Sequence, residues 1–361
     1  MKNKILTGFL LVLIGGWGSL SAQNVGSNYA RQVNTLIGTK GVGLTSGYLY
    51  PGATYPYGMV QFTPSYFSKR SGFVINQLSG GGCEHMGNFP TFPVKGKLKM
   101  SPDNILNYRI NISEEKGHAG YYEAKVQEDI HAKLTVTERT GMASYEYPAD
   151  QQYGTVIIGG GISATPIEQA AIVITAPNKC EGYAEGGNFC GLRTPYKVYF
   201  VAEFDTDALE SGTWKRNELK PNTTFAEGEY SGVYFTFDVD KKKNVQYKIG
   251  VSYVSVENAR ENLKAENTGW DFLQIQNQAE SKWNHYLGKI EVEGTNPDRT
   301  TQFYTHLYRS FIHPNVCSDV NGEYMGADFR YINPVPSTIL LLATGILIVH
   351  RFNYCQSLIL K

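Results

Sequence analysis

The chain has 361 residues, and its 33 Lys and Arg balance 33 Asp and Glu, so the formal net charge at pH 7 is zero. A chain without a basic excess has no electrostatic attraction to nucleic acid or to an anionic membrane, and neither is expected as a partner. Aromatic residues make up 13% of the chain and include 25 Tyr, which is typical of strand-rich proteins. The length allows two ordinary domains, or one large β domain with an extension.

The N-terminus has the pattern of an export signal. Lys2 and Lys4 form a basic start, residues 5–17 are apolar, and small residues follow. We expect residues 1–22 to be a secretory signal peptide, with the mature chain beginning near Gln23 in the periplasm or outside the cell.

In that compartment cysteines form disulfides, and the chain has five. An odd number leaves at least one thiol unpaired. Cys180 and Cys190 flank a short loop and could bridge, although the connectivity cannot be read from the sequence. The cysteines are not spaced as in a zinc site, so a structural zinc is not expected. The five are Cys83, Cys180, Cys190, Cys317 and Cys355.

Apolar residues alternate with polar ones in run after run between about residues 132 and 256. Turns rich in Gly, Asn and Lys separate these runs, and a period of two at this spacing favours a β-sandwich over alternating strands and helices. The clearest runs are AKLTVTE, YGTVIIGGGI, YKVYFVAEF, GVYFTFDV and VQYKIGVSYVSV.

The period changes after residue 256, where three helices are expected. ENARENLKAEN has a helical composition, and Pro297 opens the third helix, PDRTTQFYTHLYRSFI, in a position that suits proline. We expect the apolar side chains Phe303, Leu307 and Phe311 of this third helix to face a further domain. The middle helix carries an apolar stripe at helical spacing, formed by Phe272, Ile275, Ala279, Trp283 and Leu287.

Two stretches rich in Gly and Pro could present backbone at a surface. Residues 33–65 read as a series of tight turns. Residues 76–96 place Cys83, Glu84 and His85 in a glycine-rich loop with Asn88 close by. Short polar side chains on such a loop suit a hydroxyl-rich ligand, although an ordinary solvated surface loop would look the same.

A third stretch, residues 313–329, contains Asp319-x-Asn321-Gly322. This resembles the start of a calcium-binding loop, but position 330, where that loop requires Glu, is Arg. A turn is therefore expected at Asp319.

Together these stretches resemble glycoside hydrolase family 92 over about residues 28–328. The family consists of secreted, calcium-dependent exo-α-mannosidases, so the resemblance implies mannose-containing glycans as partners. The motifs that carry it, in chain order, are VNTLIGT, PGATYPYGMVQFTP, LSGGGCEHMGN, GGNFCGLRTPYKVYFVAEFD and FYTHLYRSFIHPNVCSDVNGEYMG.

The resemblance also implies the domain organisation. Residues 23–256 would form the N-terminal β-sandwich (supersandwich), residues 257–292 a helical linker, and residues 293–333 the start of an incomplete (α/α)6 barrel. Cys83, Glu84, His85 and Asn88 would bind substrate as part of the wall of the sugar pocket.

Family members invert the anomeric configuration, which requires an acid and a base carboxylate about 6.5–9.5 Å apart. The resemblance implies that both carboxylates and the calcium ligands belong to later parts of the barrel. We therefore expect no catalytic residue and no metal ligand in this chain, and an inactive protein.

The last residues, 334–361, are expected to be an out-of-frame tail. Their apolar run is shorter than the roughly 20 residues that span a bilayer, so no membrane span is expected. Synonymous codons for residues 338–357, read from each third base, can encode a peptide that begins Tyr-Ser-Thr-Phe-Ser-Tyr-Trp-Asp-Thr-Tyr-Arg. A motif of this type follows the HPN segment in family 92, so a frameshift near residue 335 explains the tail. The sequence thus predicts a truncated family 92 α-mannosidase. Two alternatives to this function are a non-catalytic carbohydrate-binding β-sandwich module and a fragment that folds poorly and has no function.

Overall fold

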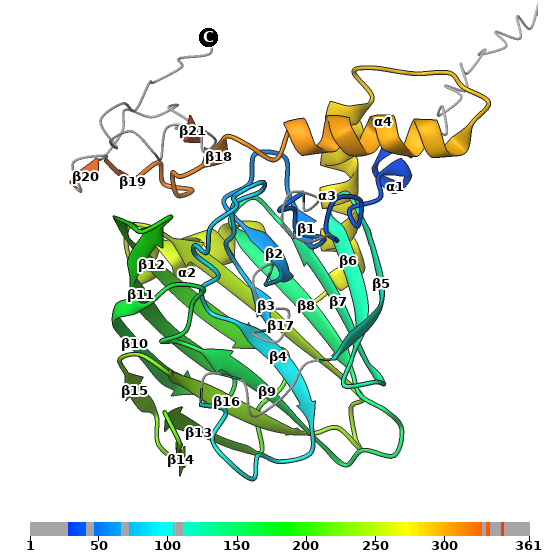
Figure 1. Cartoon of the computed structure of the whole chain (residues 1–361). Coiled ribbons are helices and arrows are strands. Elements are labelled where there is room, and N and C mark those ends of the chain that lie inside the picture. The colour runs from blue at the N-terminus through cyan, green and yellow to red at the C-terminus, as the bar shows by residue number, and fades with distance from the viewer. Residues whose placement is uncertain are drawn as a thin grey trace, which may run out of the picture.

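The computed structural model describes residues 28–40, 47–65, 72–103, 105, 111–326, 330–332 and 341–342. Two large antiparallel sheets dominate it, and the helices gather at one end and along one side (Figure 1). The fold is therefore mainly β, as predicted. The expected signal peptide and nearly all of the expected out-of-frame tail lie outside the described residues.

In the part of the chain that the structure describes, one sheet has eight strands in the order β1-β2-β3-β4-β9-β16-β13-β14. Their bounds are β1 Ala53–Thr54, β2 Gln61–Pro64, β3 Phe73–Val74, β4 Thr91–Lys95, β9 Tyr153–Gly159, β16 Ser231–Asp238, β13 Glu210–Lys215 and β14 Glu218–Pro221.

Within the same residues the other sheet has nine strands, in the order β15-β10-β11-β12-β17-β8-β7-β6-β5. These are β15 Phe225–Glu227, β10 Ile167–Ala176, β11 Lys179–Phe189, β12 Leu192–Phe204, β17 Asn244–Ser252, β8 Thr140–Glu146, β7 Ile130–Val136, β6 Tyr121–Val126 and β5 Ile112–His118. Two short antiparallel pairs follow the helices: β18 Asn315–Val316 with β21 Leu341–Leu342, and β19 Tyr324–Met325 with β20 Tyr331–Ile332.

The core lies between the two sheets, because alternate side chains of each strand point inward. On β12, Val198, Phe200 and Phe204 are fully buried, and the ring of Phe204 lies 4.9 Å from that of Phe235 on the opposite sheet. All five predicted strand runs are strands in the structure, which confirms the interpretation of their period-two pattern.

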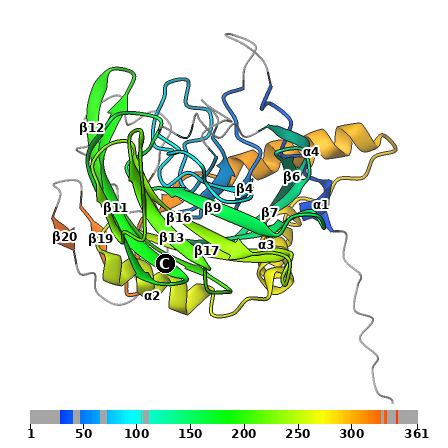
Figure 2. The same cartoon turned by 90° about the horizontal axis from the view of Figure 1, so that it is seen from below.

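All three predicted helices are present: α2 Val256–Glu266, α3 Phe272–Leu287 and α4 Pro297–Ser310, after a short N-terminal α1 Tyr29–Gln32. A side chain caps each N-terminus: the Ser255, Asp271 and Asn296 oxygens accept backbone N–H groups of the first turn. Helices α2 and α3 cover the outer face of the nine-stranded sheet (Figure 2). In the described residues no helix is both long and apolar enough to cross a membrane.

Helix α4 closes a second apolar core over α1 and α3. Trp283 of α3 and Tyr308 of α4 are both fully buried, with ring centroids 4.6 Å apart. The Trp283 indole N–H donates to the Thr54 carbonyl oxygen at 2.7 Å, and the Thr54 hydroxyl bonds to that of Tyr308 at 2.8 Å.

The expectation for Phe303, Leu307 and Phe311 needs correction in part. These three side chains are half-buried against the second core, and the fully buried face of α4 is formed by Tyr304, Thr305 and Tyr308. This chain therefore supplies a packing partner for α4 by itself, because its N-terminal segment folds back onto the helix.

Candidate functional site

The three stretches singled out from the sequence meet at one end of the sandwich. The Gly80 N–H donates to the Tyr48 carbonyl at 2.8 Å, and the Val316 N–H donates to that of Tyr57 at 2.7 Å. The Ser79 N–H donates to His313 Nε2 at 3.2 Å. Figure 1 shows β1, β2 and β18 at this end, close to α4. Segments far apart in sequence thus form a single surface.

A disulfide fixes the predicted loop, residues 83–88 (the 83–88 loop), to this surface. Cys83 is bonded to Cys190, which lies in the turn between β11 and β12, and their Cα atoms are 5.3 Å apart. The suggested bridge between Cys180 and Cys190 is therefore wrong. Strand β11 extends between those two cysteines, and ten residues of strand cover roughly 30 Å. Cys180 is buried in the core as a free thiol, and burial raises its pKa.

His85 is buried inside the 83–88 loop. The Leu78 backbone N–H donates to its Nε2 at 2.8 Å, so Nε2 is an acceptor and the proton lies on Nδ1. Nδ1 then donates to the Cys83 carbonyl at 2.6 Å. Burial lowers the pKa of His85, which keeps the ring neutral. Both ring nitrogens bond to the backbone, so His85 holds the loop in shape.

Asn88, the last residue of the 83–88 loop, is also fully buried. Its Oδ1 accepts the Tyr196 hydroxyl at 2.7 Å and Asn76 Nδ2 at 3.1 Å, and its backbone N–H donates to Asn76 Oδ1 at 2.9 Å. Glu84, by contrast, is exposed, and Cys83 is half-buried. The four predicted residues are thus brought together, but only Glu84 presents its side chain fully to solvent.

His313 and Asn315 belong to the same site and were not predicted. Asn315 Nδ2 donates to the Gly58 carbonyl at 2.7 Å, which leaves its Oδ1 to accept from His313 Nδ1 at 2.7 Å. His313 Nε2 accepts the Ser79 N–H, and burial lowers the pKa of this ring also. The signal in the sequence was the HPN segment directly after the third helix.

Charged residues that sequence reasoning also missed hold the segment after α4 in place. The Arg139 guanidinium pairs with Glu266 at 2.6 Å and with Glu138 at 2.7 Å, and its Nε donates to the Ser318 carbonyl at 2.7 Å. Burial raises the pKa of Glu138. Because the guanidinium joins the β7–β8 turn, α2 and the segment after α4, these three elements are fixed together.

Asp319 forms a turn, as predicted. Its carboxylate accepts from Ser252 Oγ at 2.6 Å and from the side-chain amides of Asn258 and Asn262 at 2.8 and 2.6 Å. The Gly322 N–H donates to the Asp319 carbonyl at 2.8 Å, and Gly322 has the positive φ of +86° that favours glycine. These hydrogen bonds occupy both carboxylate oxygens of Asp319, the atoms with which it would bind a calcium ion.

Calcium, which the family resemblance implies, does not fit the residues present. In the described part of the chain no group of three or more His, Cys, Asp or Glu side chains could hold a metal ion. The expectation that calcium ligands come from elsewhere stays a prediction.

Family models match almost the whole described chain. The glycosyl hydrolase family 92 N-terminal domain matches residues 32–252, and the catalytic domain of the same family matches residues 258–337. The chain belongs to glycosyl hydrolase family 92. The predicted family is thereby confirmed.

Individual relatives agree with this assignment. An uncharacterized secreted glycosidase of Arthroderma benhamiae is 26% identical over 354 residues, which cover 87% of this chain and 45% of that protein. A family 92 α-mannosidase from Bacteroides thetaiotaomicron has a similar fold, with a TM-score of 0.77, 24% identity, and coverage of 87% and 45%. A family 92 inverting mannosidase from the same organism has a TM-score of 0.72 and 22% identity, and the match covers 87% of this chain and 43% of that chain. The chain spans less than half the length of each relative.

The disulfide assignment leads to the first prediction. Substituting Cys190→Ser should lower the free energy of unfolding by about 2–4 kcal/mol, because the bridge closes a loop of 107 residues in the unfolded chain. Urea unfolding followed by tryptophan fluorescence measures this. A reducing agent should destabilise the native chain equally and leave the variant unchanged. Peptide mapping without reductant that linked Cys180 to Cys190 would contradict the assignment.

The buried neutral histidines lead to the second prediction, which concerns the pH dependence of stability. The unfolded chain takes up protons as the pH falls through 6.5, the usual histidine pKa, whereas folded His85 and His313 take them up only at lower pH. The free energy of unfolding should therefore fall between about pH 7.5 and about pH 5.5, by about 1.4 kcal/mol for each unit of pKa difference. His85→Gln and His313→Gln should each make this fall smaller. Equal pH dependence in the native chain and in both variants would show that these two histidines do not contribute.

Proposed function

We propose that this chain is the glycan-facing N-terminal part of an exo-acting, inverting α-mannosidase, joined to the start of its catalytic domain. Its substrates would be terminal α-mannosides, often α-1,2-linked, in N-glycans or mannans in the periplasm or outside the cell. The observation that carries the proposal is the convergence of the 83–88 loop, the Tyr48–Tyr57 turns and the His313 segment on one surface of a family 92 fold.

Each predicted residue then has a distinct part in holding sugar. The Glu84 carboxylate, exposed on a glycine-rich loop, can accept sugar hydroxyl groups with little bulk in the way. His85 and Asn88 act as positioning residues, because their polar atoms bond to the loop backbone and to Asn76 and Tyr196. The disulfide of Cys83 holds the loop against the β11–β12 turn.

Hydrolysis with inversion needs two carboxylates about 6.5–9.5 Å apart, with water between the base and the sugar. The 83–88 loop supplies one carboxylate, Glu84, and a single carboxylate cannot both protonate the leaving group and activate water on the opposite face. We therefore assign the acid, the base and the calcium ion of the intact family to later parts of the catalytic domain. Calcium would there help to hold and polarise the sugar hydroxyls.

The test is release of mannose from an α-1,2-linked mannobiose with calcium present. This chain should release none above a buffer blank, whereas a gene with its reading frame restored near codon 335 should encode an active enzyme. In that enzyme Glu84→Gln should lower kcat/KM about tenfold, equivalent to the loss of about 1.4 kcal/mol of transition-state binding, with an unchanged melting temperature. His85→Gln should lower both the activity and the melting temperature.

Clear mannose release by this chain alone would contradict the assignment of both catalytic carboxylates to later residues. Unchanged kinetics in Glu84→Gln would show that the 83–88 loop has only a structural role. The matched control is Glu128→Gln, an exposed carboxylate in the β6–β7 turn, which should leave kcat/KM and the melting temperature as they are.

A further inference from the structure

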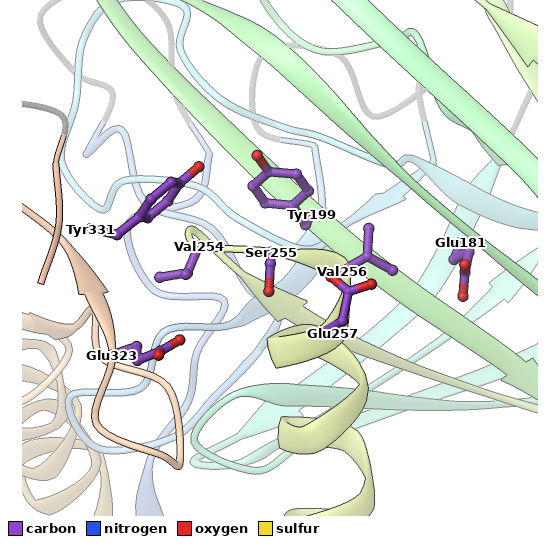
Figure 3. A pocket seen from close by; sticks show the side chains of 8 residues that line it. All are labelled: Glu181, Tyr199, Val254, Ser255, Val256, Glu257, Glu323 and Tyr331. Atoms are coloured by element: carbon purple, nitrogen blue, oxygen red, sulfur yellow. The ribbon is translucent and has the colours of Figure 1, made fainter. Parts of the chain in front are cut away.

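A cavity of about 640 Å³ lies on the outer side of the nine-stranded sheet, and none of the predicted site residues lines it. β11 and β12 form one side, the N-terminus of α2 forms the floor, and the β19–β20 hairpin closes the other side (Figure 3). Its volume falls in the range of about 300–1,000 Å³ that is typical of small-molecule sites.

Two tyrosines form the apolar part of the cavity. Tyr199 projects from the outer face of β12 and Tyr331 from β20, and their hydroxyls point toward one another (Figure 3). The Tyr331 side chain is 58% exposed, and Tyr199 is half-buried. Val254 and Val256 extend this apolar surface along the floor. An aromatic ring with a polar tip suits a ligand that has both C–H faces and hydroxyl groups.

Three carboxylates surround the tyrosines, and two of them are held in position. Glu181 accepts from the Arg260 guanidinium at 2.6 Å, and Glu323 accepts from Asn258 Nδ2 at 2.8 Å. Each uses its Oε2, and in the described residues no partner binds its Oε1. Glu257 lies at the start of α2 and is exposed. Ionised carboxylates only accept hydrogen bonds, so they offer fixed acceptors to a ligand that carries hydroxyl donors.

The charge of the cavity narrows the class of ligand. Its lining includes Glu181, Glu257 and Glu323. The Arg260 guanidinium pairs with Glu181 at 2.6 Å, and the Lys197 ammonium lies 5.6 Å from the centre of the Tyr199 ring. The negative charge that faces a ligand therefore comes from Glu257 and Glu323. Like charges repel at short range, so phosphorylated or otherwise anionic sugars are disfavoured. A neutral sugar ring satisfies the apolar faces and the carboxylate acceptors together.

We infer that this cavity is a second glycan-binding site, which holds one or two neutral sugar units on Tyr199 and Tyr331, separate in its residues from the 83–88 loop. The identification of its sugar as mannose rests on the proposed function, but binding at this site requires no catalytic activity. The site would keep a polymeric substrate attached to the protein while chain ends are presented elsewhere, which raises the effective concentration of ends.

The experiment is affinity electrophoresis of the full chain in native gels that contain neutral α-mannan, with a starch gel in parallel. The chain should be retarded in the mannan gel. Tyr199→Ala should weaken binding about tenfold or more, as expected for loss of a central aromatic contact, whereas Tyr199→Phe should keep most of it. Tyr331→Ala, at an exposed position on a short hairpin, should weaken binding without affecting folding, which a thermal melt checks.

Two matched controls should bind as the native chain does. Phe225→Ala removes an exposed aromatic ring from β15 at the edge of the same sheet, outside the cavity. Glu128→Gln removes an exposed carboxylate from the β6–β7 turn, also outside the cavity. Loss of retardation in Glu84→Gln, with full retardation in Tyr199→Ala and Tyr331→Ala, would overturn the inference. Equal retardation of every variant would also overturn it, as would no retardation of the native chain in either gel.

The two gels separate this inference from the proposed function. Retardation that depends on Tyr199 in starch but does not occur in mannan would support a sugar site at the cavity and contradict a mannoside substrate. Retardation in mannan that depends on Tyr199, together with an inactive frame-restored enzyme, would support the cavity and contradict the proposed catalysis.

Discussion

The Arg309 guanidinium fixes the start of the catalytic domain to the N-terminal segment of the sandwich. Its Nη1 donates to the Tyr50 carbonyl at 3.1 Å, and its Nη2 donates to that of Thr35 at 2.7 Å. Buried backbone carbonyls in irregular segments need donors, and here a side chain of α4 supplies them. Tyr50 itself packs with Trp283 and Tyr308 in the second apolar core, where all three are fully buried.

The candidate site depends on this docking, because His313 and Asn315 follow α4 within a few residues. Their bonds to Ser79 and Gly58 form only when α4 lies where Arg309 holds it. The disulfide of Cys83 and the neutral ring of His85 fix the neighbouring 83–88 loop. A loop held by these bonds presents Glu84 from a fixed backbone, and such preorganisation reduces the entropy lost when a ligand binds.

The sequence was informative where the determinants are local. Period-two alternation predicted the strands, and the i+4 spacing of Ile275, Ala279 and Trp283 predicted the buried face of α3, which the structure confirms. The caps at Asp271 and Asn296 are likewise readable, because the capping oxygen and the N–H that it accepts lie within one turn.

The parts that sequence reasoning missed are set by contacts between distant residues. The partner of Cys83 lies 107 residues away, and only the extended course of β11 excludes Cys180 as the partner of Cys190. The role of His85 depends on burial beneath segments from other parts of the chain. The second cavity combines residues of β11, β12, α2 and the β19–β20 hairpin, and no motif joins them. Family resemblance located the loop but not which of its side chains face outward.

The central claim is that α4 and the sandwich form one folded unit in this chain, and amide hydrogen exchange of the full chain tests it most directly. Local stability determines how slowly buried amides exchange. The account predicts that the amides of residues 304–308 in α4, which surround the buried Tyr304 and Tyr308, exchange as slowly as those of α3 around Trp283. Rapid exchange throughout α4, with slow exchange kept in the two sheets, would show that the helix is not docked and would contradict the account.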